Sequence, residues 1–123
     1  NARVQKFTSA GNFIGWLGAD ETGNAGWHGV GTSNAGVKDT GACRFRTPTD
    51  LAVDGEDCLY VLDGEVSAIQ KFGPDHERKE FGHHVITLDS AEGFVGLDLD
   101  GVGNFYTTSQ DQQIRRYLPS LSQ

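Results

Sequence analysis

Residues 51–72 and residues 97–117 carry the same pattern in two copies. A third, partial copy opens the chain, because RVQKF at residues 3–7 repeats most of AIQKF at residues 68–72. A repeat period of about 45 residues is typical of solenoids, propellers and other arrays, so the fold depends on what one repeat forms. The identical residues keep a constant offset: Leu51, Asp54, Gly55 and Tyr60 correspond to Leu97, Asp100, Gly101 and Tyr106.

Each copy predicts short antiparallel strands rather than helices. Apolar and polar residues alternate, aromatic and β-branched residues follow, and glycine-containing turns separate the segments. The 17 glycines interrupt most windows that could hold a helix of three turns. Four strands in about 45 residues match the blade of a β-propeller. We expect strands at 51–54, 58–62, 68–72 and 77–81 in the first copy, and at 97–100, 104–108 and 113–117 in the second.

The first copy resembles a known family. Phe45 and Pro48 precede LAVD at residues 51–54, LYVLD follows at residues 59–63, and IQKF follows at residues 69–72. This pattern resembles the NHL repeat, which implies an all-β fold of four-stranded antiparallel blades in a β-propeller that usually has six blades.

The resemblance covers the single domain of residues 1–123 unevenly. It implies a half blade over residues 3–18, a full blade over 45–82 and a near-complete blade over 93–117. Residues 19–43 match no repeat, and we expect them to form a long inserted loop. In the last copy Ala91 and Phe94 stand where counterparts of Phe45 and Pro48 belong, so the start of its first strand departs from the family pattern.

The predicted strands do not close a ring. Third and fourth strands come first, then a complete blade, then the first three strands of another. Each open blade face would expose roughly 500 Å² of apolar surface, which soluble monomers rarely tolerate. Two explanations remain: the chain is a piece of a longer propeller, or several copies associate to complete one. A fourth strand in the tail at residues 119–121 would favour self-assembly.

Charge and composition limit the partners. The net charge is −7, and the basic residues gather on no single predicted face, so nucleic acid is not an expected partner. No apolar run approaches the roughly 20 residues that a membrane-spanning helix needs, so no membrane partner is expected. Cys43 and Cys58 fit neither a hairpin disulfide nor a zinc motif, and we expect two free thiols.

Histidines supply a candidate metal site. His28 lies in the predicted loop, and His83 and His84 lie in the equivalent connection one repeat later. The family includes an amidating lyase that holds zinc through histidines at its channel mouth, which implies that these three could hold zinc or calcium. Asp20, Glu21 or Asp50 would supply carboxylates. The alternative is that they are ordinary surface histidines and that the chain needs no cofactor.

The leading functional hypothesis is a scaffold that binds a protein or a small ligand. No motif for nucleophilic or phosphate chemistry occurs, so an enzyme is not favoured. A metal-dependent propeller enzyme of the lyase or lactonase type and a self-assembly module are the alternatives. The predicted recognition face consists of the connections at residues 19–47, 63–67, 83–94 and 109–112. Its candidate residues are Trp27, His28, Arg44, Asp50, Asp63, Glu65, His83, His84, Gln110 and Asp111.

Two further residue types have structural interpretations. Asp54 and Asp100 are expected to close the first hairpins by accepting backbone hydrogen bonds, not to act as catalytic acids. Trp27 could instead fold back as a lid over a blade, and Trp16 is expected to pack within its sheet. His76 falls on a turn of the opposite face, and no role is expected for it.

Overall fold

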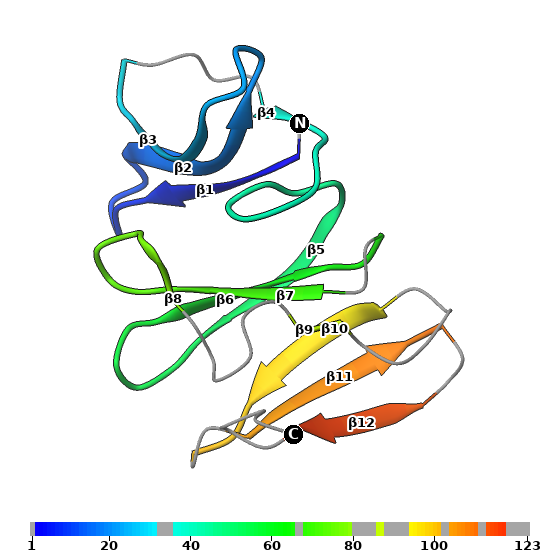
Figure 1. Cartoon of the computed structure of the whole chain (residues 1–123). Helices are drawn as coiled ribbons and strands as arrows, with labels where there is room; N and C mark the ends of the chain where they lie inside the picture. The colour runs from blue at the N-terminus through cyan, green and yellow to red at the C-terminus, as the bar shows by residue number, and fades with distance from the viewer. Residues whose placement is uncertain are drawn as a thin grey trace.

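The computed structural model is all-β (Figure 1). The structure describes residues 2–31, 36–65, 68–79, 86–87, 94–101, 104–110 and 113–117. These residues form strands β1 to β12, arranged in three antiparallel sheets and joined by turns. Within the described part of the chain no helix is long and apolar enough to cross a membrane.

The first sheet, sheet A, contains β1 (Arg3–Phe7), β2 (Phe13–Asp20), β3 (Ala25–Gly29) and β4 (Gly36–Val37). The first two strands occur where the repeat pattern predicts them. The expectation that residues 19–43 form a loop without strands is wrong, because β3 and β4 both pair with β2. Strand β3 reads AGWHG, whose glycines hide the alternation that predicts a strand, and its pairing with β2 holds it extended.

The second sheet, sheet B, contains the strands of the first full copy. These are β5 (Pro48–Val53), β6 (Leu59–Asp63), β7 (Ala68–Phe72) and β8 (Arg78–Lys79), in sequence order. A short additional strand, β9 (Ile86–Thr87), pairs with the start of β7 and was not predicted. Sheet C contains β10 (Phe94–Leu99), β11 (Phe105–Ser109) and β12 (Ile114–Tyr117), which lie at the predicted positions. The tail beyond residue 117 lies outside the described residues.

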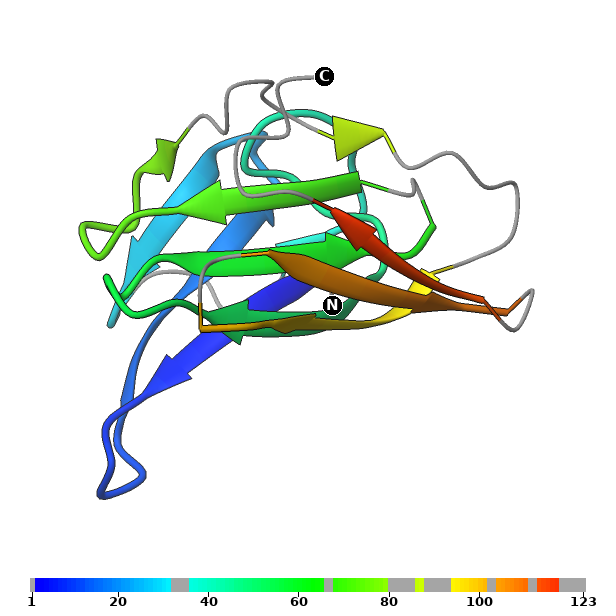
Figure 2. The same ribbon diagram turned by 90° about the horizontal axis from the view of Figure 1, so that it is seen from below.

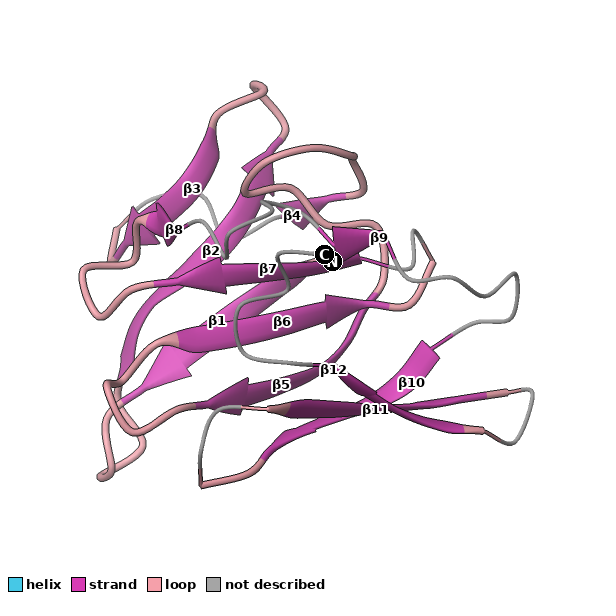
Figure 3. Ribbon diagram, turned by 60° about the horizontal axis from the view of Figure 1, so that its bottom comes forward, coloured by secondary structure: helices cyan, strands magenta, loops and turns pink. Residues whose placement is uncertain are grey.

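The three sheets stack with sheet B in the middle (Figures 1, 2 and 3). Because side chains alternate along a strand, adjacent residues of sheet B point toward different sheets, one toward sheet A and the next toward sheet C. Val61 and Phe72 pack toward sheet A, whereas Leu62 and Ile69 pack toward sheet C. The backbone N–H of Leu97 on β10 also donates a 2.7 Å hydrogen bond to the Asp50 carboxylate on β5. Sheet B is therefore covered on both faces.

The outer faces of the stack carry polar as well as apolar residues. On sheet C the side chain of Ile114 is 75% exposed, but exposed Thr108 and Arg116 stand on the same face. On sheet A the outward-facing Trp16 is fully buried. Polar residues and local coverage thus reduce the apolar surface that each end of the stack exposes.

Asp54 and Asp100 close hairpins as predicted. The Asp54 carboxylate accepts hydrogen bonds from the backbone N–H groups of Glu56 and Cys58, and Asp100 accepts one from Asn104. Each also accepts the hydroxyl of the tyrosine six residues later, Tyr60 or Tyr106. Burial and this bond raise the pKa of Tyr60. The repeated aspartates and tyrosines therefore form one structural unit in each copy.

Among the described residues, four five-residue turns share a backbone pattern. In each, the fourth residue donates its N–H to the first residue's carbonyl and adopts a positive φ. This left-handed conformation favours glycine, and the first two turns use it. The fourth positions are Gly11 (φ 90°), Gly23 (φ 90°), Asp57 (φ 64°) and His76 (φ 68°).

Cys43 and Cys58 form no disulfide with each other. Cys58 packs against the core between sheets B and C, and Cys43 against the core between sheets A and B. The backbone N–H of Cys43 donates to the side chain of buried Gln70, which also donates to the carbonyls of Gly41 and Arg44. One glutamine thus anchors the connection that leads into sheet B.

Candidate functional site

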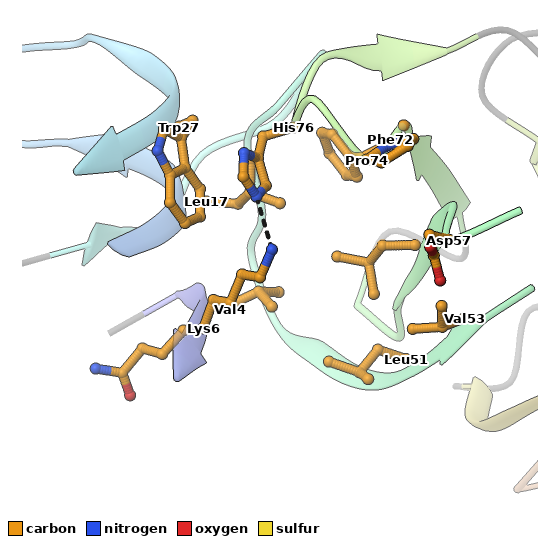
Figure 4. Close-up of a pocket in the computed structure, with 13 residues that line it drawn as sticks. Val4, Lys6, Leu17, Trp27, Leu51, Val53, Asp57, Phe72, Pro74 and His76 are labelled. Carbon is orange, nitrogen blue, oxygen red and sulfur yellow. Dashed lines mark hydrogen bonds between the residues drawn. The ribbon is translucent and has the colours of Figure 1, made fainter. Parts of the chain in front are cut away.

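A groove of about 430 Å³ lies between sheets A and B (Figure 4). Its lining includes Asp57 of the β5–β6 turn and Pro74 and His76 of the β7–β8 turn, and both turns lie at the same end of the stack as the β1–β2 turn (Figure 1). Its walls are mostly apolar, and a few polar side chains stand at its margins, a composition typical of ligand sites. We call it the A–B groove. Its apolar lining consists of Val4, Leu17, Trp27, Leu51, Val53, Leu59, Phe72 and Pro74.

Trp27 forms the upper wall of the A–B groove in Figure 4. It pairs with Leu17 across the β2–β3 ladder and shares its face of sheet A. The indole lies over Gly15, where an added Cβ would stand 2.5 Å from its ring and 2.5 Å from the His28 carbonyl. A side chain at Gly15 would therefore displace the tryptophan. The close approach of glycine and indole fixes where this wall stands.

His76 stacks on Trp27. Their ring centroids are 3.8 Å apart and the planes differ by 8°. His76 reaches this position from the left-handed position of its turn, which costs a non-glycine residue roughly 1 kcal/mol or more. Residues held in such conformations cluster at functional sites. The turn thus places an imidazole at the groove where two other turns have only a glycine.

Lys6 approaches the same imidazole from β1, with its Nζ 3.1 Å from Nε2 of His76. An ammonium group can only donate, so Nε2 accepts and the neutral ring carries its proton on Nδ1. Burial lowers the pKa of His76, and the Lys6 ammonium lowers it further, while Asp75 acts in the opposite direction. A neutral histidine and a lysine cation therefore stand side by side at the groove.

The charges at the groove are separated. Asp57, which holds the left-handed position of the β5–β6 turn, lines the wall across from Trp27 and Lys6 (Figure 4). Among the described residues, none of the ion pairs includes Lys6 or Asp57. The groove therefore has one cationic end and one anionic end with apolar walls between them.

The predicted recognition residues of sheet B stand at the other end of that sheet and form structural contacts. The Asp63 carboxylate is buried and accepts the backbone N–H groups of Arg46 and Thr47. Glu65 accepts from Thr47 Oγ1 at 2.6 Å and from Arg46 Nε at 2.7 Å, and lies 3.5 Å from Lys38 Nζ. The bonds from Thr47 and Arg46 lower the pKa of Glu65 to about 2. This network fastens the segment before β5 to the β6–β7 turn.

The other predicted recognition residues are dispersed. Arg44 pairs with Asp39 at 2.8 Å and donates to the Gly23 carbonyl. Asp50 links sheets B and C, and Gln110 is exposed. His83, His84 and Asp111 lie outside the described residues. Of the predicted residues that the structure describes, only Trp27 lines the A–B groove.

His28 lies on β3, not in a loop as predicted. It points away from Trp27 and stacks on Trp16, with ring centroids 4.0 Å apart. Its Nε2 donates to the Gly18 carbonyl at 3.1 Å, and its Nδ1 lies 3.9 Å from the Asp20 carboxylate. Within the described residues, no three His, Cys, Asp or Glu side chains are grouped to hold a metal ion. The suggested partners of His28 in such a site, His83 and His84, are not among those residues.

Sequence reasoning missed Lys6, Asp57 and His76. A signal was present in the turns, because TSAGN at residues 8–12 aligns with GPDHE at residues 73–77 after the matching RVQKF and AIQKF segments. This alignment puts His76 opposite Gly11, in the position that requires a positive φ. A histidine where the backbone prefers glycine is a reason to suspect a function.

No family model matches the chain, and no curated protein matches its sequence. The solved structure of virginiamycin B lyase from Staphylococcus aureus is similar over 94% of this chain, with a TM-score of 0.41 and 8% sequence identity. This chain covers 41% of the lyase, so it spans less than half the length of that protein. At this level of similarity the lyase assigns no activity to the chain.

Proposed function

We propose that the chain is a binding scaffold that takes a small, largely apolar ligand in the A–B groove. The observation that carries the proposal is a cavity of about 430 Å³ with apolar walls and few polar groups, located between two packed sheets. Sites of this shape bury most of a ligand's surface and use their polar groups to orient it. Trp27 and His76 stack on each other and bring two aromatic rings to one side of the groove.

We further propose that the scaffold is part of a β-propeller. Three sheets built from consecutive antiparallel hairpins stack face to face, and the repeated sequence pattern spans the second and third of them. In this arrangement a further sheet would cover each outer face, supplied by more chain or by another copy. The A–B groove would then lie between two neighbouring blades.

Filling the groove tests the binding function. Val53 lines the groove and is 57% exposed, so Val53→Phe adds bulk there without opening the core. The probe is the neutral apolar dye N-phenyl-naphthylamine, followed by its fluorescence during titration. We expect saturable binding to the unmodified chain and an affinity loss of about tenfold or more in Val53→Phe, because the added ring occupies the dye's volume.

Ile114→Phe is the matched control. It adds the same ring to an exposed apolar position on the outer face of sheet C, away from the groove. Dye affinity should stay within about twofold of the unmodified chain, since exposed sites far from the ligand act independently. Equal losses in both variants, or no saturable binding to the unmodified chain, would refute the proposed function.

A further inference from the structure

The A–B groove carries a cation, Lys6, that forms no ion pair with a described carboxylate. The Lys6 ammonium has three N–H donors, and the only hydrogen bond described for it goes to the neutral imidazole of His76. No carboxylate of a described residue forms an ion pair with it, although the chain as a whole has a net charge of −7. A positive group beside an apolar cavity in an acidic protein is a local feature that favours an anion.

The opposite wall excludes an anion from the other end of the groove. Asp57 lies across from Lys6 beside Val53, and its carboxylate would repel a second negative charge (Figure 4). Between the two ends the groove offers only apolar surface, made by Val4, Leu17 and Phe72 among others. The two charges therefore favour an anionic group at the Lys6 end of the groove and disfavour one at the Asp57 end.

We infer that the A–B groove binds an anionic amphiphile, an apolar chain or ring that bears one carboxylate, with the carboxylate at Lys6 and the apolar body toward Val53. This inference rests on the proposed function and specifies its ligand class. Two N–H donors of Lys6 remain for the carboxylate oxygens, and hydrogen bonds to charged partners are stronger than neutral ones. The stacked Trp27 and His76 rings would lie along the apolar body.

Displacement of N-phenyl-naphthylamine by three eight-carbon compounds tests the inference. Octanoate, octanol and octylamine share the same apolar chain and differ in their polar group. We expect octanoate to compete roughly tenfold better than octanol, which corresponds to one charged hydrogen bond. Octylamine should compete less well than octanoate, because Lys6 repels its ammonium and the amine must reverse in the groove to reach Asp57. Lengthening the acid by one methylene should improve its affinity by roughly fourfold while the chain still fits the groove.

Lys6→Met separates the charge from the cavity. Lys6 is exposed and its stem is retained in methionine, so the variant should fold, and its own dye affinity is the reference for its competition measurements. Octanoate should then lose roughly tenfold and compete like octanol. Lys38→Met is the matched control, because it removes the same charge from a residue that pairs with Glu65 outside the groove. Its octanoate affinity should be unchanged.

The histidine provides a spectroscopic readout at the site. The groups that act on the His76 ring are Lys6 from β1 and Asp75 from its own turn, and burial contributes most to its lowered pKa. A carboxylate bound at Lys6 would stabilise the protonated ring, so the pKa of His76 measured by NMR should rise when octanoate is added and stay constant when octanol is added.

The outcomes distinguish the two proposals. If the dye binds and Val53→Phe weakens it, but octanol competes as well as octanoate and Lys6→Met changes nothing, the groove is a binding site and the carboxylate assignment is wrong. If the dye does not bind, the proposed function fails, and the ligand class fails with it.

Discussion

The two faces of sheet B are packed differently although the same strands form both. Toward sheet C the junction is filled: Leu62, Ile69 and Phe105 are fully buried and Tyr60 packs on Phe105 with ring centroids 6.5 Å apart. Toward sheet A, Leu17, Val61 and Phe72 also form a buried core, but the A–B groove lies beside it. The filled face holds the stack together, and the hollow face is the part of the molecule available for a ligand.

The largest expected difference between the faces is in stability. Phe105→Ala removes a ring that is 1% exposed from the B–C junction, and we expect it to lower the free energy of unfolding by about 3–5 kcal/mol. Val53→Ala on the wall of the A–B groove should cost less than about 1 kcal/mol, because the side chain is already largely exposed. Urea denaturation measures both. Similar losses at the two sites would contradict the distinction between a filled and a hollow face.

An intermediate effect is expected where the wall of the groove is built. Gly15→Ala forces a methyl group against Trp27 and the β3 backbone, and overpacking of this kind costs about 1–3 kcal/mol. Gly29→Ala is an unusually close control, because Gly29 pairs directly with Gly15 and has open space around its Cβ position. Its stability should change by less than about 0.5 kcal/mol.

Trp27 fluorescence adds a structural readout to that pair. Gly15→Ala should alter the emission spectrum, since the indole must leave its contact with His76, whereas Gly29→Ala should not. If both variants behave alike in stability and in emission, Trp27 is not held by the approach to Gly15.

The smallest expected effect is a gain in stability at the junction between sheets B and C. The Thr107 hydroxyl is fully buried toward sheet B and has no described hydrogen-bond partner. Val61 occupies the equivalent position of the first copy, so Thr107→Val follows the repeat and removes an unsatisfied polar group. We expect a gain of about 1 kcal/mol in the free energy of unfolding, measured by urea denaturation. A loss would mean that the hydroxyl has a partner in solution.

Much of sheets B and C could be predicted from the sequence because their residues alternate. Leu51 to Val53 and Leu59 to Asp63 carry apolar and β-branched side chains that fit a pleated surface. Strand β3 could not be predicted in this way, because Gly26 and Gly29 interrupt its alternation and the strand is defined by its pairing with β2. Tertiary pairing, not local propensity, makes this strand.

The candidate site was predictable only in part. The sequence singles out Trp27 as an aromatic residue in a polar segment and predicts it in a loop, whereas it lies on β3. Lys6 and His76 are seventy positions apart and meet only when sheet A packs on sheet B. One local signal for His76 exists in the sequence. Aligning its turn with the first turn places it at the position of Gly11, which has a positive φ.

The hydrogen bond from Leu97 to Asp50 has a consequence for solubility. Strand β10 is an edge of its sheet, and unpaired edge amides are templates on which another chain can add a strand and begin to aggregate. The Asp50 carboxylate accepts a hydrogen bond from one of these amides, that of Leu97, and also brings negative charge to the edge. The same contact that joins two sheets thus guards the chain against polymerisation through β10.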